Sequence, residues 1–366
     1  MLNLYYQLIQ KIMEGVENIH MITQQNAPPQ QQTGATVAIP NTSGSIYKNN
    51  VNSYLKKNFQ QEIHSFIASG QAKTGYSNLD AVIGKLYPGL YVLGAGSSLG
   101  KTTFLLQMAD QLIADCEPVL YFTMEQSQLE LVTKTLSRRA ALKCKTNPKM
   151  AKTAIQIRRG DITQEVKDAY QDYLADASIF TIVQGDFSTD MTEVERIVDD
   201  YVKVTSKVPI IMVDYLQIVQ EDSQMTDKAK IDSITKRLKI LQRKHNAVVM
   251  VISSINRANY MLSIDFESFK ESGSIEYSAD VVWGLQLQII NDQAFTQAKG
   301  VSQKRRMIAM AKAASPRKVE LVCLKNRYGI ASYNCGFLYY PQFDLFTPDP
   351  QFKASAPVCP TPQIII

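Results

Sequence analysis

The sequence has few residues of the kinds that cross-link a chain or bind zinc. It contains five cysteines, none of them paired as C-x-x-C, and three histidines that lie far apart. This scarcity argues against a zinc site and against a disulfide framework, and it fits a reducing, cytoplasmic setting. Apolar residues never run on for the roughly eighteen positions that a membrane span needs. The N-terminus lacks a basic stretch ahead of its apolar positions, so we expect neither a secretory signal nor a membrane partner.

The chain is long and apolar enough for one large core. Its 366 residues, 45% of them hydrophobic, suit a single α/β domain with extensions rather than several full domains. The net charge is only +5, but it is unevenly spread. Residues 134–159 hold nine Lys or Arg and no acid, and residues 289–320 hold seven basic residues and two acids. Each run is either a solvated face or, in a protein that handles phosphates, a contact to nucleic acid or to another subunit.

Composition divides the chain into five parts. Residues 1–22 place apolar side chains at helical spacing, which predicts a short amphipathic helix, and residues 23–50 have the composition of a flexible linker. Residues 51–70 again repeat apolar positions every three or four residues. They predict a linker helix that packs on its own domain or docks on a neighbouring subunit. We assign 71–346 to the main domain and expect the Pro-rich 347–366 to be a disordered tail.

Short, continuously apolar runs alternate with helical patterns through the main domain. Such runs are typical of strands buried in a parallel sheet, and the alternation predicts βαβ units with helices on both faces. We expect strands at 90–93, 118–123, 178–183, 209–214 and 247–252, with further strands at the sheet edge at 280–287, 319–324 and 336–340. The fold class is therefore α/β.

The strongest local signal runs from Gly89 to Thr103. An apolar run enters a loop of small residues that closes on Gly-Lys-Thr, and an apolar helical pattern begins at once. A polyphosphate needs several backbone N–H donors aimed at one point, which small residues allow, and a helix N-terminus adds partial positive charge. The alternative is an ordinary Gly-rich turn. We expect ATP to bind along this loop, at Ala95, Gly96, Ser97, Ser98, Leu99, Gly100, Lys101, Thr102 and Thr103.

Two residues of this loop carry most of the expected chemistry. Lys101 reaches the β- and γ-phosphates, and the Thr102 hydroxyl holds Mg²⁺. Ala95 stands where the motif usually has its first glycine. We expect this exchange to be tolerated because Ala still leaves the backbone accessible.

Two acids follow predicted strands at the edge where a parallel sheet binds ligands. Asp214 ends the most apolar strand, where it can join Thr102 in orienting Mg²⁺ and its waters. Glu125 ends the neighbouring strand, where it can orient and deprotonate the attacking water. The alternative role for either acid is to cap the helix that follows.

A pair of cations near the end of the chain completes the candidate site. Lys325 and Arg327 alternate in an extended segment and therefore point the same way. They can neutralise charge that develops on a γ-phosphate, in the same chain or in a neighbouring subunit. Taken alone, two basic residues near a turn are most often simply solvated.

Eight segments follow one another in a distinctive order. They are Thr74–Asp80, Ser98–Thr102, Phe122–Glu125, Asp214–Gln217, Arg237–Lys239, Asn256–Arg257, Glu271–Asp280 and Lys325–Gly329. In residues and order they resemble the C-terminal motor domain of DnaB-type replicative helicases, most closely the version fused to primases in phages and mobile elements. The resemblance implies a RecA-like P-loop NTPase fold and a hexameric ring with ATP between subunits.

The resemblance also implies roles for particular residues. Glu125 would be the catalytic base, Asp214 the second acid of the metal site, and Lys325 with Arg327 an arginine-finger pair acting in trans. The helix at 51–70 would dock on the next subunit. Loops after Gln217 and around residues 257–274 would hold single-stranded DNA in a central channel, with Arg257, Lys270, Ser272 and Gly273 as the expected contacts.

Two departures from the family pattern limit these expectations. Ser254 stands where the family usually has a Gln that senses the γ-phosphate, and a shorter side chain there puts the coupling of hydrolysis to DNA movement in question. The front of the chain lacks the zinc-binding cysteines and acidic motifs of a primase. We therefore expect a motor that works with a separate primase or helicase loader.

The function we expect is an ATP-dependent helicase motor that translocates on single-stranded DNA and unwinds duplex during replication. One alternative is a RecA-like ATPase that loads or remodels DNA complexes without unwinding. The other is a non-catalytic assembly factor that uses ATP only to hold a ring together.

Overall fold

The computed structural model describes residues 51–69, 72–144, 151–186, 188–216, 219, 225–256, 261–269 and 272–353. The helix and linker predicted for 1–50 lie outside these residues. The chain divides into one unit that ends at Gln60 and a second that begins at Gln61. The single helix predicted over 51–70 is two helices, α2 (Val51–Lys57) and α3 (Phe59–Ser69), because a turn at Asn58 separates them. Asn has low helix propensity.

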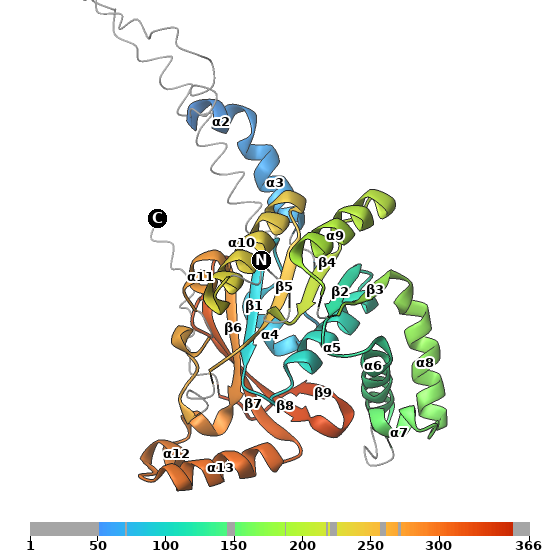
Figure 1. Cartoon of the computed structure of the whole chain (residues 1–366), viewed down its shortest axis with the longest axis vertical. Helices are drawn as coiled ribbons and strands as arrows, with labels where there is room; N and C mark the ends of the chain where they lie inside the picture. Colours follow the sequence, from blue (N-terminus) through green and yellow to red (C-terminus); the bar gives the residue numbers. More distant parts are fainter. Residues whose placement is uncertain are drawn as a thin grey trace, which may run out of the picture. The chain divides into compact units, whose positions relative to one another are not determined.

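The second unit is organised by one sheet of nine strands (Figure 1) in the order β3-β2-β4-β5-β1-β6-β7-β8-β9. The pairs from β3 to β6 in this order are parallel, and the last three pairs are antiparallel. The strands are β1 (Gly89–Ala95), β2 (Val119–Thr123), β3 (Phe180–Gln184), β4 (Ile210–Asp214), β5 (Val248–Ser254), β6 (Val281–Leu287), β7 (Arg317–Asn326), β8 (Asn334–Tyr340) and β9 (Leu345–Pro348). The predicted α/β class with a mostly parallel sheet is confirmed.

The position of β6 differs from the prediction. Residues 280–287 were expected at the sheet edge, but β6 lies between β1 and β7, and every residue of the strand is buried. A parallel partner on one side and an antiparallel partner on the other explain this position. The edge strand on this side of the sheet is β9, whose last two residues, Thr347 and Pro348, fall in the segment expected to be tail. The backbone N–H of Asp349 bonds to the Gly336 carbonyl at 2.9 Å, and residues 354–366 lie outside the described part.

Helices cover both faces of the sheet. They are α4 (Ser77–Ile83), α5 (Lys101–Ala114), α6 (Gln128–Lys143), α7 (Ala154–Arg158), α8 (Gln164–Asp176), α9 (Met191–Thr205), α10 (Asp227–His245), α11 (Ser272–Ser278), α12 (Gln293–Gln297) and α13 (Val301–Ala313). Side chains of β1 alternate between two cores, with Tyr91 and Leu93 in one and Leu90 and Val92 in the other. Helices α4 to α8 contribute to the first core and α9 to α11 to the second. No helix among the described residues has the length and apolar character of a membrane span.

Strand register brings several chain segments to one edge of the sheet. At the carboxyl ends, Ala95 of β1 pairs with Ser254 of β5, and Thr123 of β2 pairs with Asp214 of β4. In open α/β sheets this edge is where ligands bind. It is the part of the fold that positions the candidate site.

Candidate nucleotide site

The loop between β1 and α5 has the backbone of a phosphate-binding loop. Gly100 precedes α5 with φ 86°, in the left-handed region that favours glycine. A Cβ at Gly100 would lie 2.9 Å from the rings of Phe346 and Tyr339, so a larger residue does not fit. Ser98 also has a positive φ, 64°. The 14-residue helix α5 starts directly after this turn, and its first N–H groups therefore face the loop.

Two predicted residues of the loop show how its ends are set. Ala95 is the last residue of β1, buried and paired with β5 and β6, and its φ is not positive. Since no left-handed backbone is needed there, Ala can stand where glycine is usual. The Lys101 ammonium donates a hydrogen bond to the Ala95 carbonyl at 3.0 Å. The Lys101 side chain therefore folds back over the loop, where a bound phosphate would meet it.

Not every residue of the predicted loop turns its side chain to this edge. The Thr103 hydroxyl is buried and donates to the Asp344 carboxylate at 2.9 Å. The Leu99 side chain is buried in an apolar cluster. These two residues can offer a ligand their backbone only, whereas Ser97 and Ser98 are exposed.

Asp214 lies beside the loop, at the end of β4. The residue is 3% exposed, and its carboxylate accepts a hydrogen bond from the Tyr121 hydroxyl at 3.1 Å and interacts with the Thr102 hydroxyl. Burial raises the pKa of Asp214, and the hydrogen bonds from Thr102 and Tyr121 lower it in part. The negative charge of Glu125 raises this pKa further, and the charge of Lys101 lowers it. A buried carboxylate in this setting gains from a nearby cation.

The donor set around Asp214 suits magnesium. A Thr hydroxyl and a carboxylate in contact with one another are hard oxygen ligands, which Mg²⁺ prefers, and this ion usually keeps several waters besides. Thr102 and Asp214 therefore fit the metal-binding role predicted for them.

Glu125 is held near Asp214 but stays exposed to solvent. The backbone N–H of Met124 donates to the Asp214 carbonyl at 3.0 Å, which extends the pairing of β2 and β4 by one residue. Glu125 follows directly and is exposed. The helix after it does not use Glu125 as its cap, since Ser127 caps α6 in a capping box with Glu130. The alternative role as a helix cap is therefore wrong, and the Glu125 carboxylate is available at this edge.

Lys325 and Arg327 lie at the other end of the strands, where the amino ends of the parallel strands form the amino edge of the sheet. The N–H of Arg327 bonds to the Asp280 carbonyl, and the N–H of Asp280 bonds to the Leu90 carbonyl, so this segment lies beside the start of β1. The phosphate loop follows the other end of that seven-residue strand, about 20 Å away along the strand. These two cations cannot reach the phosphate loop of their own chain.

A buried acid, Asp280, anchors this second group; in the sequence it was identified only as the last residue of the Glu271–Asp280 segment, with no role of its own. The Asp280 carboxylate is 4% exposed and accepts a hydrogen bond from the Leu90 N–H at 2.8 Å. It forms ion pairs with Arg327, at 3.2 Å, and with Lys239. Arg327 stays 49% exposed, so its guanidinium is held at one end and faces solvent. The Lys325 ammonium donates to the Glu276 carbonyl, and burial with repulsion from Arg327 lowers the pKa of Lys325.

The predicted DNA contacts are only partly described. Arg257 and Lys270 lie outside the described residues, as does the side chain of Ser272. Gly273 is in α11, which precedes β6 and lies at the end of the sheet away from α13 (Figure 1). Ser254 pairs with Ala95, so the residue at the usual sensor position does border the phosphate loop.

Comparison with known proteins places this geometry in a family. The family described as DnaB-like helicase C terminal domain matches residues 72–347. The replicative DNA helicase DnaB of Mycoplasma pneumoniae is 23% identical over 278 residues, which cover 70% of this chain and 52% of that protein. That of Synechocystis sp. is 25% identical over 203 residues, covering 54% of this chain and 22% of the relative. The chain thus spans about half or less of the length of these curated relatives.

Solved structures agree on the fold. A structure described as the ATPase domain of G40P superposes with a TM-score of 0.64 at 19% identity, covering 84% of this chain and all of that one. A DnaB-like replicative helicase, solved in a study of its interactions with primase, gives a TM-score of 0.62 at 17% identity, covering 82% and 71%. At these identities the similarity establishes the RecA-like fold of this family.

Proposed function

The chain belongs to the family of DnaB-like helicase C-terminal domains, and on that premise we propose that it is the motor of an ATP-driven replicative DNA helicase. The observation that carries the proposal is the division of the site between two edges of one sheet. Lys101, Thr102 and Asp214 gather at the carboxyl edge, whereas Arg327 lies at the amino edge. Such a site is complete only when the amino edge of one subunit meets the carboxyl edge of the next.

Within one subunit, the residues at the carboxyl edge bind ATP and prepare it for hydrolysis. Lys101 and the first N–H groups of α5 would hold the phosphates, and Thr102 with Asp214 would hold Mg²⁺, whose charge would offset that of the phosphates. Glu125 orients a water molecule for attack on the γ-phosphate and accepts its proton, so that ATP and water yield ADP and phosphate.

Between subunits, Arg327 and Lys325 complete the site. Their distance from the phosphate loop of their own chain supports a role in trans, where they stabilise charge on the transferred phosphoryl group. We propose a ring of six subunits as the closed arrangement of this head-to-tail contact. Exposed apolar residues of α2 and of the start of α3, among them Val51, Leu55 and Phe59, support a docking role for these helices on the neighbouring subunit.

The track for the ring is single-stranded DNA, held in the channel by the segments after residues 217 and 257. A sequence-independent grip of this kind is electrostatic and weakens steeply with salt. Since one structural relative was solved with its primase interactions described, a primase or a loader is our proposed partner. The closer kinship to primase-fused proteins of phages and mobile elements remains part of this proposal.

A strand-displacement assay tests the proposed function. The substrate is a forked duplex with a fluorescent strand, and the reaction contains ATP and Mg²⁺. We expect the wild-type chain to release the labelled strand and Lys101→Ala to release none. Hydrolysis that single-stranded DNA stimulates, without any strand release, would contradict unwinding and favour a loading or remodelling ATPase.

A further inference from the structure

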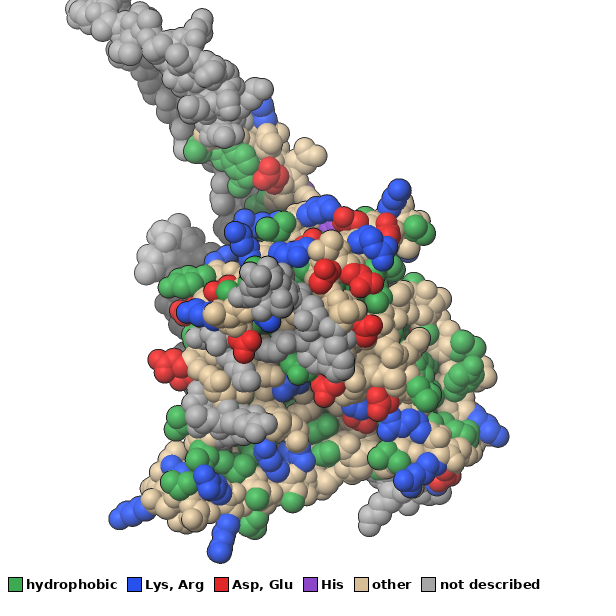
Figure 2. All heavy atoms as spheres, viewed as in Figure 1, with side chains coloured by type: hydrophobic (Ala, Val, Ile, Leu, Met, Phe, Trp, Pro, Cys, Tyr) green, Lys and Arg blue, Asp and Glu red, His purple; other side chains and the backbone are tan. Residues whose placement is uncertain are grey.

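Helix α13 is an unusually basic surface element next to the phosphate loop. It follows β6 and precedes β7 along the chain, and it has no buried residue. It belongs to a stretch, residues 293–319, that holds seven Lys or Arg and no acid. Basic side chains project from this end of the molecule (Figure 2). The proposed hydrolysis and the proposed DNA channel use none of these charges.

The orientation of α13 is set by its inner face. Met307, Ile308 and Ala311 are partly buried against the main core. The Lys304 ammonium lies over the Phe295 ring, 5.2 Å from its centroid. The rest of the helix surface faces solvent, and it carries two adjacent exposed arginines, Arg305 beside the inner face and Arg306 farther from it.

The last turn of α13 and the start of β7 donate hydrogen bonds to backbone carbonyls of the phosphate loop. The Lys312 ammonium donates to the Ser97 carbonyl at 3.3 Å, and the Arg317 guanidinium donates to the Ser98 carbonyl. Arg317 also donates to the Lys312 carbonyl, so the two cations form one unit. In a phosphate-binding loop the N–H groups face the anion. Cations on the carbonyls therefore fix the loop from its outer side.

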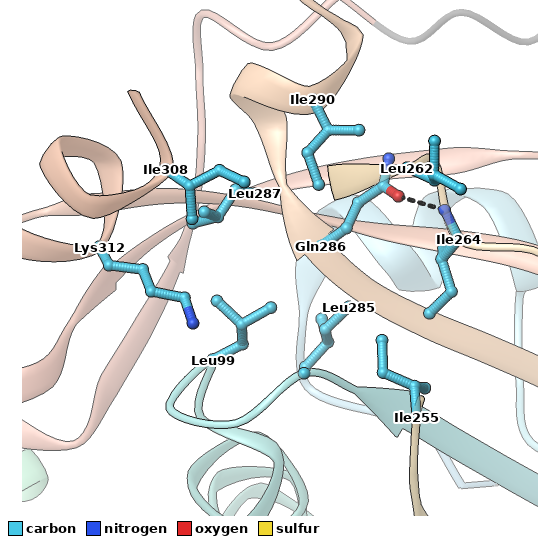
Figure 3. Close-up of a pocket in the computed structure, with 11 residues that line it drawn as sticks. Leu99, Ile255, Leu262, Ile264, Leu285, Gln286, Leu287, Ile290, Ile308 and Lys312 are labelled. Carbon is cyan, nitrogen blue, oxygen red and sulfur yellow. Dashed lines mark hydrogen bonds between the residues drawn. The ribbon is translucent and has the colours of Figure 1, made fainter. Parts of the chain in front are cut away.

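An apolar contact joins the same two elements. Leu99 of the loop and Ile308 of α13 line a cavity of about 30 Å³, with Leu287 and Ile290 beside them (Figure 3). Arg305 lies seven residues before Lys312, on the same side of the helix and about 10 Å away along its axis. A ligand bound to Arg305 thus acts on the same helix whose last turn is hydrogen-bonded to the phosphate loop.

We infer that α13 binds the phosphate backbone of a nucleic-acid strand through Arg305 and Arg306, and that Lys312 and Arg317 transmit this binding to the phosphate loop. The inference rests on the proposed function for the site that it regulates. Phosphate backbone is favoured over an acidic protein because residues 299–318 hold seven Lys or Arg and no acid, and lack the aromatic residues that together with Arg anchor protein interfaces. A row of cations without such anchors matches a sequence-independent phosphate contact.

The first test measures, by fluorescence anisotropy, the equilibrium binding of a labelled oligothymidylate without ATP across a salt series. Arg305→Glu/Arg306→Glu is compared with Lys203→Glu/Lys207→Glu, which makes the same charge change at exposed positions at the end of α9 and just after it. We expect the α13 variant to bind at least about tenfold more weakly at low salt. Its salt slope should fall by about one to two, as two lost phosphate contacts require. Equal binding by both variants would overturn the inference.

Two further outcomes would also overturn it. If polyglutamate binds wild-type α13 and the oligonucleotide does not, α13 recognises an acidic protein. If the α13 variant loses the ring in sedimentation while the control keeps it, α13 is a subunit contact. Because binding is measured without turnover, these results stand apart from the proposed function, which fails only if wild-type protein shows no unwinding.

The second test addresses transmission to the loop. Lys312→Met keeps the aliphatic stem of the side chain and removes the ammonium that holds the Ser97 carbonyl. We expect this variant to bind oligothymidylate as the wild type does, but to lose at least about two thirds of the stimulation of ATP hydrolysis by that oligonucleotide. Full stimulation in Lys312→Met would refute the coupling.

Discussion

Replacing Asp280 with Asn tests whether one buried carboxylate organises the amino edge of the sheet. Asp280 is 4% exposed and Lys239, its ion-pair partner, is 15% exposed. Removing one member of a buried pair leaves an uncompensated charge, which typically costs about 3–5 kcal/mol. Asn keeps an acceptor for the Leu90 N–H, so we expect a loss near the lower end, about 3 kcal/mol. That is a large part of the roughly 5–15 kcal/mol by which a domain is usually stable.

The assay is equilibrium unfolding by urea, without nucleotide, and the chain offers a matched control. Asp200 pairs with Arg196 at 2.9 Å, but these side chains are 60% and 63% exposed. Exposed pairs of this kind are worth about 0–1 kcal/mol, so Asp200→Asn should shift the unfolding midpoint only slightly. Equal and small shifts in the two variants would refute the reasoning, because burial would then not decide the value of the Asp280 pair.

The remaining predictions concern the carboxyl edge. Glu125→Gln should bind ATP as the wild type does and lower its turnover by at least about 10², the lower range for general base catalysis; near-normal hydrolysis would place the base elsewhere. Asp214→Asn should raise the melting temperature without Mg²⁺ at neutral pH. The pKa of Asp214 is raised in the folded chain, so folding stability falls as pH rises through that pKa, and Asn removes this penalty. If added Mg²⁺ raised the melting temperature of Asp214→Asn as much as that of the wild type, the metal-binding role of Asp214 would be contradicted. Gly100→Ala should abolish ATP binding. Gly160 has a similar φ of 87°, but no atom lies within 4 Å of the position its Cβ would take, so Gly160→Ala should lose only about 1–2 kcal/mol of stability and should still bind ATP.

Local sequence patterns predicted the parts of the site that lie within one βα unit. The β1 strand, the phosphate loop and α5 are contiguous, so the run of apolar, small and helical residues carries the whole arrangement. Asp214 was predicted from the same logic, since the carboxyl ends of parallel strands share an edge. These are cases in which neighbours along the chain, or a topological rule, determine neighbours in space.

Contacts between distant segments were not predictable in this way. Thr103 bonds Asp344, 241 residues away, and nothing near Thr103 in the sequence indicates that its hydroxyl turns into the core. The grip of Arg317 on Ser98 joins residues 219 apart, and the basic run around α13 alone could not show that it ends on the phosphate loop. The position of β6 was predicted wrongly for the same reason: its partners, β1 and β7, are set by long-range pairing that the sequence of β6 does not show.

The central claim is that each ATP site is shared by two subunits, and mixed rings test it most directly. Arg327→Ala subunits lack the cation at the amino edge, and Glu125→Gln subunits lack the base at the carboxyl edge. Each variant alone should hydrolyse little ATP. When the two are mixed before assembly, an intact Glu125 meets an intact Arg327 at some interfaces, and hydrolysis should recover in proportion to the number of such interfaces. No recovery in well-mixed rings would contradict the shared site and assign Arg327 another role.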